Sequence, residues 1–263
     1  MFSYLYKLFL NFGKYTPVVG ILNLFKFSLL KIFKTDKLIK FKINYFGSYF
    51  YFRSISDEST LPRLSEGYFF VKPNFVVKEF IECGSTIGMT SLHFMAAYNQ
   101  ANITLLEPVK DNFELLKKNL SMFQKVKIFE IGLSNENCFL SLGKESEEKR
   151  SINFSKYYSK QTSEKSEFID INKFFDTYHL TNTDIIHINI NGAEVDLFED
   201  ISWIKYCKIV IVYIFNIHQN NTNLIIDKLI NDKNYDLNFE IYNFHLIISH
   251  KKYSYSVDTI KLI

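Results

Sequence analysis

The chain has few cysteines and no apolar run long enough to cross a membrane. Its three cysteines are odd in number and scattered, at Cys83, Cys138 and Cys207. That pattern argues against a disulfide framework and favours a reducing compartment. The longest uncharged run of the N-terminal region, residues 15–25, is too short to span a bilayer. The N-terminus also lacks a small-residue cleavage site typical of a signal peptide. We therefore expect a cytoplasmic protein.

Metal-binding patterns are missing as well, since there is no C-x-x-C and no His/Cys cluster. The composition, 47% hydrophobic and 22% charged, is that of a folded globular chain. The charge is uneven, because residues 1–75 carry 11 basic and 4 acidic residues while the rest carries 20 and 24. A basic, Phe-rich N-terminus can contact an anionic membrane surface or a phosphate-bearing substrate. We favour the alternative, lysine-bearing helices packed on the main domain.

Hydrophobic periodicity predicts an α/β protein. An N-terminal extension, residues 1–75, contains helices over 1–34, a β-hairpin over 40–51, and a helix and loop over 58–74. Residues 76–263 alternate strands and helices and end in a hairpin, which implies a mostly parallel sheet covered on both faces. The strands are expected at 76–82, 102–107, 127–130, 184–189, 208–215, 237–242 and 245–249. The helices are expected at 90–99, 111–123, 171–178, 195–206 and 222–231.

One segment within this alternation has no clear periodicity. Residues 143–165 are rich in Lys, Glu and Ser and predict a mobile loop or an extended hairpin. Beside a ligand site such a segment is either a lid or an inert surface insertion, and the sequence leaves both open.

The most informative stretch is the turn from Glu82 to Gly88, which joins an apolar strand to a predicted helix. A strand, a glycine turn and a helix N-terminus make a nucleotide-binding corner. Glycine lets the backbone approach a ligand, and the first-turn N–H groups point at it. Nineteen residues after Gly88, Glu107 closes the next apolar run, where an acidic residue can accept hydrogen bonds from ribose hydroxyls. The glycine turn and Glu107 together predict a nucleoside cofactor.

The turn also distinguishes between cofactors. A nicotinamide dinucleotide site needs G-x-G-x-x-G, whose middle glycine admits a pyrophosphate, and that glycine is absent between Gly84 and Gly88. A sulfonium nucleoside has no pyrophosphate, so it needs less space beside the backbone of the turn. Together with Glu107 and the terminal hairpin, this favours S-adenosylmethionine (SAM).

The chain resembles the FkbM-type SAM-dependent methyltransferases over about residues 40 to 250. Six segments carry the resemblance in order: Arg53-x-x-Ser56-Asp57; Glu82-Cys83-Gly84-Ser85-Thr86-Ile87-Gly88; Glu107-Pro108 with Asn112-x-x-Leu115-Leu116-x-x-Asn119; Phe168-Ile169-Asp170-Ile171-Asn172; Ile188-Asn189-Ile190-Asn191-Gly192-Ala193-Glu194; and Asn216-Ile217-His218. The resemblance implies a Rossmann-like class I methyltransferase fold with a seven-stranded sheet, an extension on the lid or substrate side, and O-methylation of a sugar or other small-molecule hydroxyl.

Three positions that are acidic in that family are amides here: Asn189, Asn191 and Asn216. An amide forms hydrogen bonds but cannot act as a general base or bind a divalent cation strongly. We therefore expect catalysis without metal. The changes also motivate an alternative, a methyltransferase-like fold that no longer catalyses and serves as a binding or scaffolding module.

The predicted cofactor residues are Glu82, Gly84, Ser85, Gly88, Glu107 and Asn189, with Glu82 and Ser85 at the methionine end. For the acceptor, His218 is the first candidate base, because it follows the carboxyl end of a strand and its pKa suits the role. A surface histidine capping the next loop is an equal alternative. Glu194 either orients the acceptor or stabilises its own helix by placing a negative charge in the first turn.

Two further expectations concern charged and buried groups. His187 should be a hydrogen-bonded core histidine. Arg53 and Asp57 either pair with each other or bound the substrate side, and we favour the pair. We expect no nucleic-acid partner, because the chain lacks N-P-P-Y and has no stacking aromatic at the fourth-strand corner.

Overall fold

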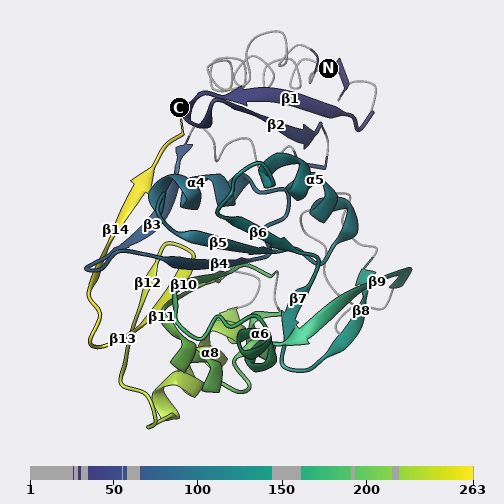
Figure 1. The fold of residues 1–263 in the computed structure, drawn as a ribbon. Helices are drawn as coiled ribbons and strands as arrows, with labels where there is room; N and C mark the ends of the chain where they lie inside the picture. Colours follow the sequence, from purple (N-terminus) through teal and green to yellow (C-terminus); the bar gives the residue numbers. More distant parts are fainter. Residues whose placement is uncertain are drawn as a thin grey trace, which may run out of the picture.

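The fold is organised around one large sheet. The computed structural model describes residues 26, 29–30, 35–54, 56–57, 66–143, 161–190, 193–214 and 219–262. The sheet has seven strands in the order β12-β13-β11-β10-β4-β5-β6 (Figure 1). They are β4 (Glu79–Cys83), β5 (Asn102–Leu106), β6 (Val126–Phe129), β10 (Thr183–Ile188), β11 (Cys207–Tyr213), β12 (Leu237–Tyr242) and β13 (His245–His250).

Strand directions confirm the predicted fold class. Strands β6, β5, β4, β10 and β11 are mutually parallel, whereas β13 is antiparallel to both β11 and β12. This is the Rossmann-like class I methyltransferase arrangement, a mostly parallel sheet with an antiparallel hairpin at the C-terminal side. All six residues of the central strand β10 are buried, as expected for a parallel strand covered on both faces.

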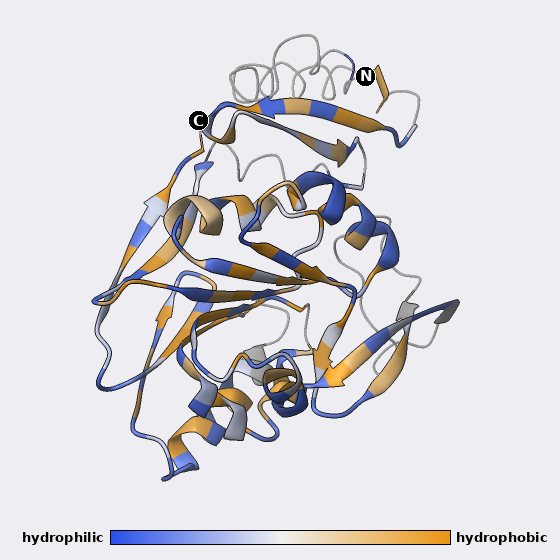
Figure 2. Ribbon diagram, viewed as in Figure 1, coloured by the Kyte–Doolittle hydropathy of each residue, from blue (hydrophilic) through white to orange (hydrophobic). Residues whose placement is uncertain are grey.

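Helices cover the two faces of the sheet (Figure 1). One face packs against α4 (Met89–Ala97) and α5 (Lys110–Leu120), the other against α6 (Ile171–Thr177), α7 (Glu194–Leu197) and α8 (Gln219–Asn231). Because side chains of a strand alternate, Phe80 joins the first core and Ile81 the second. Figure 2 shows α5 as mostly blue with apolar segments between, and because Leu115, Leu116 and Leu120 are buried, this helix is amphipathic. The predicted helices α4, α5, α6 and α8 begin and end within three residues of their observed limits.

The predicted N-terminal hairpin is present. Strands β1 (Leu38–Ile43) and β2 (Ser48–Arg53) are antiparallel and connected through η1 (Asn44–Phe46) and Gly47. Alternate residues of both strands, such as Phe41 and Phe52, are buried in the α4/α5 core. Figure 1 shows the hairpin lying over α5, which contacts β2. The helices predicted over 1–34 fall almost wholly outside the described residues.

The structure corrects the prediction over 58–74. Its described part contains a strand, β3 (Tyr68–Pro73), which is antiparallel to an unpredicted strand near the C-terminus, β14 (Tyr255–Ile260). Alternate residues Phe69 and Val71 are buried. The strand was missed because its partner lies at the other end of the chain.

The segment 143–165 is partly described. Strands β7 (Gly132–Ser134), β8 (Cys138–Gly143) and β9 (Gln161–Asp170) form a separate sheet in the order β7-β9-β8. Strands β8 and β9 are antiparallel, which confirms the extended-hairpin interpretation for the residues described. Residues 144–160 lie outside them.

The single helix predicted over 195–206 is wrong. The chain forms the short α7 and a separate 3-10 turn, η3 (Ser202–Tyr206). Between them the Asp200 carboxylate accepts a hydrogen bond from Ser202 N at 2.9 Å, a local side-chain contact that competes with a continuous helix. No helix in the described ranges is both long and apolar enough to span a membrane.

Candidate functional site

Three predicted segments meet at the carboxyl edge of the parallel strands. Gly84 follows β4, Glu107 follows β5, and Asn189 follows β10. The backbone N–H of Gly84 donates to Leu106 O at 3.0 Å, and that of Asn189 donates to Cys83 O at 3.0 Å. The carboxyl edge at the centre of such a sheet is where α/β proteins bind ligands. The structure therefore brings the glycine turn, Glu107 and the end of the fourth parallel strand together.

Both glycines of the turn are required by packing. Gly84 has φ +81°, and a Cβ there would lie 1.9 Å from the carbonyl oxygen of Asn189. Gly88 has φ +91°, and a Cβ there would lie 2.6 Å from Leu120 Cδ1 on α5. Only glycine fits such positions without strain. The two residues thus hold the turn against β10 and α5, whatever ligand the turn binds.

The backbone donors of the turn are largely satisfied by the protein itself. The N–H groups of Gly84 and Ser85 both donate to Leu106 O, and that of Gly88 donates to Ser85 O at 2.8 Å. The N–H of Thr86 donates to Glu107 Oε2 at 2.8 Å. These four N–H groups therefore have acceptors within the protein, and they precede the first turn of α4, whose N–H groups the sequence predicts to face a ligand. A phosphate would need such donors, whereas a ligand that supplies its own donors would not.

Glu107 is the acceptor group of this edge. It is 4% exposed, and its Oε1 accepts from Val109 N at 3.0 Å and from Asn112 Nδ2 at 3.3 Å. Burial raises the pKa of Glu107 to about 7, although these hydrogen bonds, the one from Thr86 and the Arg53 charge act in the opposite direction. A carboxylate has about four acceptor sites, and the hydrogen bonds from Thr86, Val109 and Asn112 use three of them. It therefore retains capacity to accept from a ligand hydroxyl.

Glu82 lies on β4 just before the turn, and Ser85 is part of the turn. Glu82 is 1% exposed, and its Oε2 accepts from Ser91 Oγ on α4 at 2.5 Å. Its Oε1 is 3.9 Å from His187 Nδ1 on β10. The hydroxyl of Ser85 donates to Glu82 O at 3.2 Å. Glu82 thus connects β4 to α4 and β10, and Ser85 fastens the turn to the end of β4.

A histidine–tyrosine cluster continues from Glu82 across the same face of the sheet. Tyr68 OH lies 3.4 Å from His187 Nε2 and 3.2 Å from His245 Nε2. His187 is fully buried, as expected of a core histidine, and His245 is 5% exposed. The aromatic rings of Phe69 and Tyr213 pack on His245, with centroids 4.2 and 5.0 Å away. Sequence reasoning missed Tyr68 and His245, since only the β3–β14 pairing and the terminal hairpin bring them together.

The fourth-strand corner is only partly described. Glu194 is 6% exposed, and its Oε1 accepts from Ile190 N at 2.9 Å, so it closes the loop after β10. Asn189 is half-buried beside Gly84. The other predicted residues of this region, Asn191, Asn216 and the candidate base His218, lie outside the described residues. Within the part of the chain that is described, no three His, Cys, Asp or Glu side chains are grouped to hold a metal ion.

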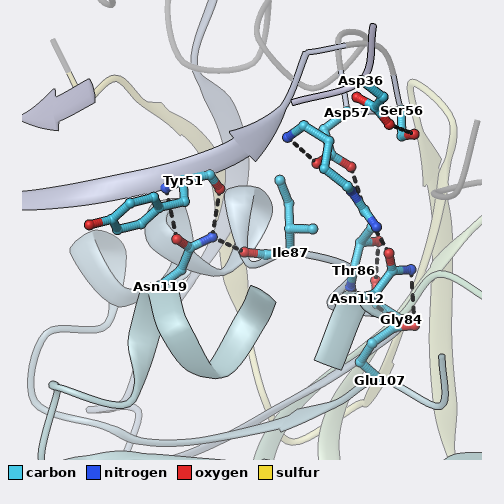
Figure 3. Close-up of polar contacts among 11 residues, drawn as sticks. Asp36, Tyr51, Ser56, Asp57, Gly84, Thr86, Ile87, Glu107, Asn112 and Asn119 are labelled. Carbon is cyan, nitrogen blue, oxygen red and sulfur yellow. Dashed lines mark hydrogen bonds and ion pairs between the residues drawn. The ribbon is translucent and has the colours of Figure 1, made fainter. Parts of the chain in front are cut away.

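Two asparagines of α5 connect the N-terminal hairpin to this edge (Figure 3). Asn112 accepts from Arg53 Nη2 at 2.6 Å. Asn119 accepts from Tyr51 N at 2.8 Å and donates to Tyr51 O and to Ile87 O, each at 2.9 Å. The predicted pairing of Arg53 with Asp57 is confirmed at 2.7 Å. The spacing of the two asparagines, seven residues on a helix, places them on one face and is a signal that the sequence contained.

Comparisons with known proteins give fold-level likeness only. No family model matches the chain, and no curated protein sequence matches it. Among solved structures it is similar to methyltransferase FkbM from Methylobacillus flagellatus, with TM-score 0.44, 11% identity and coverage of 66% of this chain and 44% of that one. A putative rRNA-methylase from Clostridium thermocellum gives TM-score 0.40, 8% identity and coverage of 66% and 89%. Fibrillarin from Aeropyrum pernix with bound SAM gives TM-score 0.37, 12% identity and coverage of 82% and 81%. This chain thus spans less than half of the FkbM structure, and at these scores the likeness does not identify a substrate.

Proposed function

We propose that this chain binds SAM and methylates a hydroxyl group of an acceptor molecule. The observation that supports this most is the polarity of the carboxyl edge. Four N–H groups of the glycine turn already have protein acceptors, and the carboxylate of Glu107 stands beside them. Such an edge suits a cationic nucleoside whose ribose hydroxyls donate hydrogen bonds, and disfavours a dinucleotide pyrophosphate.

The residues present fit such a cofactor. Glu107 accepts from the ribose hydroxyls, while Gly84 and Gly88 keep the turn close to β10 and α5. We assign Glu82 and Ser85 to the methionine end through their support of the turn, and Asn189 to the same end through its contact with Gly84. When bound, SAM supplies a methyl group activated by a positively charged sulfur. The protein aligns the acceptor oxygen with that group, which can supply most of the rate enhancement.

A hydroxyl acceptor must also lose its proton. We retain His218 as the proposed general base, because it follows β11, whose carboxyl end lies at this edge. Glu194 closes the neighbouring loop and would orient the acceptor through it. Neither role requires a metal ion.

The acceptor class rests on the family resemblance, which favours a sugar or another small molecule. A nucleic-acid acceptor stays open, although the sequence predicts no nucleic-acid partner, since a putative rRNA-methylase is among the similar folds. A peripheral membrane contact through the basic N-terminus and a cytoplasmic location also remain proposals.

Calorimetry with SAM and S-adenosylhomocysteine, first without metal and then with magnesium, tests the cofactor. We expect micromolar binding without metal and at least a tenfold loss in Glu107→Ala, because about two charge-assisted hydrogen bonds disappear. The matched control is Glu114→Ala, which removes an exposed carboxylate from α5. Unchanged binding in Glu107→Ala would remove the cofactor assignment.

The second candidate is a methyltransferase-like binding module without catalysis. The amides at Asn189, Asn191 and Asn216 favour it, because these three positions are acidic in the family that the chain resembles. Methyl transfer to a panel of sugar, small-molecule and RNA acceptors discriminates between the two. Tight SAM binding with no turnover across the panel would support the binding module.

A further inference from the structure

The N-terminal hairpin ends in a buried ion pair. Arg53, the last residue of β2, donates from Nε to Asp57 Oδ2 at 2.9 Å and from Nη2 to Asp57 Oδ1 at 2.7 Å. The backbone N–H of Arg53 also donates to Asp57 Oδ2 at 2.7 Å. Arg53 is 9% exposed and Asp57 is fully buried. Two parallel hydrogen bonds fix the plane of the guanidinium group, so the direction of its remaining donors is fixed too.

That guanidinium reaches the cofactor edge through Asn112 (Figure 3). Arg53 Nη2 donates to Asn112 Oδ1 at 2.6 Å, and Asn112 Nδ2 donates to Glu107 Oε1 at 3.3 Å. Arginine only donates, so Asn112 must present its oxygen to Arg53. Its NH₂ group must then face Glu107. An ionised carboxylate accepts this bond more strongly than a neutral one, so the chain of donors favours the charged form of Glu107.

The opposing influence is desolvation, the largest of the effects on Glu107, which favours the neutral acid. Three hydrogen-bond donors face this carboxyl group: Thr86 N, Val109 N and Asn112 Nδ2. The charge that acts on its pKa is the guanidinium of Arg53. A neutral Glu107 is a weaker acceptor for ribose hydroxyls. The ion pair and its asparagine therefore counteract the burial of the residue that the cofactor needs.

We propose that Arg53, Asp57 and Asn112 are positioning residues for Glu107, so that the N-terminal hairpin belongs to the cofactor half of the site. The inference rests on the proposed SAM site and differs from the expected lid or substrate-side role of the extension. Removing Asn112 weakens cofactor binding around neutral pH and much less in alkali, where Glu107 is ionised without help.

The test measures the dissociation constant of S-adenosylhomocysteine by calorimetry between pH 6 and 9. The probe variant is Asn112→Leu, which keeps the Arg53–Asp57 pair intact. Asn119→Leu is the matched control, because Asn119 lies on the same face of α5 and also holds β2, and its side chain bonds Tyr51 and Ile87 instead of Glu107. The amine of the ligand titrates equally in every experiment. The ratio of variant to wild-type dissociation constants at each pH therefore reflects titration of the protein and not of the ligand.

We expect Asn112→Leu to bind about tenfold more weakly at pH 6, about fivefold more weakly at pH 7 and within about threefold of wild type at pH 9, as when the acid dissociation constant of Glu107 falls about tenfold. Asn119→Leu should lower stability and give a ratio that does not change with pH. A double variant, Arg53→Met with Asp57→Asn, removes the pair without leaving one charge buried and should shift the profile in the same direction.

Two results would overturn the inference while leaving the SAM site standing: an Asn112→Leu ratio that is constant with pH, or no change at all. Wild-type protein that binds no S-adenosylhomocysteine at any pH would instead remove the proposed function, and the inference with it. If Asn112→Leu does not fold, the double variant decides by the same criterion.

Discussion

Gly84 and Asn189 are packed so tightly that a Cβ on the glycine would lie 1.9 Å from the asparagine carbonyl oxygen. The turn after β4 and the end of β10 are therefore joined by direct backbone contact. Gly84 also has φ +81°. Any side chain at this position must push the two strand ends apart.

We expect Gly84→Ala to lower the free energy of unfolding by about 3 kcal/mol or more, combining left-handed strain with a backbone clash. Gly47→Ala is the control, because Gly47 has φ +64° but nothing within 4 Å of its Cβ position. It should cost about 1 kcal/mol from conformation alone. Urea unfolding measures both. Equal losses would show that the contact with Asn189 relaxes easily.

Glu107 should make stability depend on pH with a defined sign. Its pKa is raised from 4.5 to about 7 in the folded protein, so the folded state binds the proton more tightly than the unfolded state. The stability that the neutral acid contributes is complete below pH 4.5 and is lost as the pH rises through 7. Relative to Glu107→Gln, wild type should therefore lose stability between pH 4.5 and 7.

Thermal unfolding of the two proteins across this range checks the slope. Any misfit of the glutamine amide adds an offset that does not vary with pH. Wild type gaining stability relative to Glu107→Gln as the pH rises would contradict the direction of the pKa shift.

The central sheet was predictable from sequence because its inner strands are short segments rich in large apolar residues. In β11 every residue except Lys208 is apolar, and β10 contains three isoleucines among its six residues. The position of Glu107 beside the turn followed from the parallel order. Pairings between distant segments were not predictable, since nothing local to Tyr68 indicates that β14 is its partner. For residues 143–165 the sequence left a loop and an extended hairpin open, because the polar residues Gln161 to Glu167 of β9 resemble those of a loop.

The site was predicted in part for the same reason. Residues that follow strands, such as Gly84 and Asn189, take their place from the sheet. Residues that act across space do not: Arg53 and Asn112 are 59 positions apart, and only the docking of the hairpin on α5 brings them within 2.6 Å. The use of the turn's own N–H groups by Leu106 O and Glu107 was likewise invisible without the fold.

The shared hydroxyl of Tyr68 predicts different tautomers for the two neighbouring histidines. A hydroxyl has one proton, so it donates to one imidazole Nε2 and accepts from the other. While both rings are neutral, one of His187 and His245 should carry its proton on Nε2 and the other on Nδ1. Long-range ¹H–¹⁵N spectra distinguish the two forms. Identical tautomers in both rings would show that Tyr68 does not bridge them.

Removing that hydroxyl should also destabilise the fold. Tyr68→Phe loses contacts to two buried ring nitrogens, and we expect about 1–2 kcal/mol lower stability by urea unfolding. Tyr45→Phe is the control, because Tyr45 is 52% exposed. It should change stability by less than about 0.5 kcal/mol. Equal effects in the two variants would mean that the Tyr68 cluster contributes no net hydrogen-bond energy.

Asn189→Asp tests whether the amides are an adaptation or a loss. The carboxyl edge already holds Glu107 and Glu194, both less than a tenth exposed. A third carboxylate on the half-buried Asn189 adds like charge where burial already disfavours ionisation. We therefore expect SAM affinity to stay equal or to fall, with the larger loss at low ionic strength where repulsion is least screened. Calorimetry at two salt concentrations measures this. A clear gain in SAM affinity would show instead that the site binds the cofactor better with an acid at position 189. That result would favour the non-catalytic binding module.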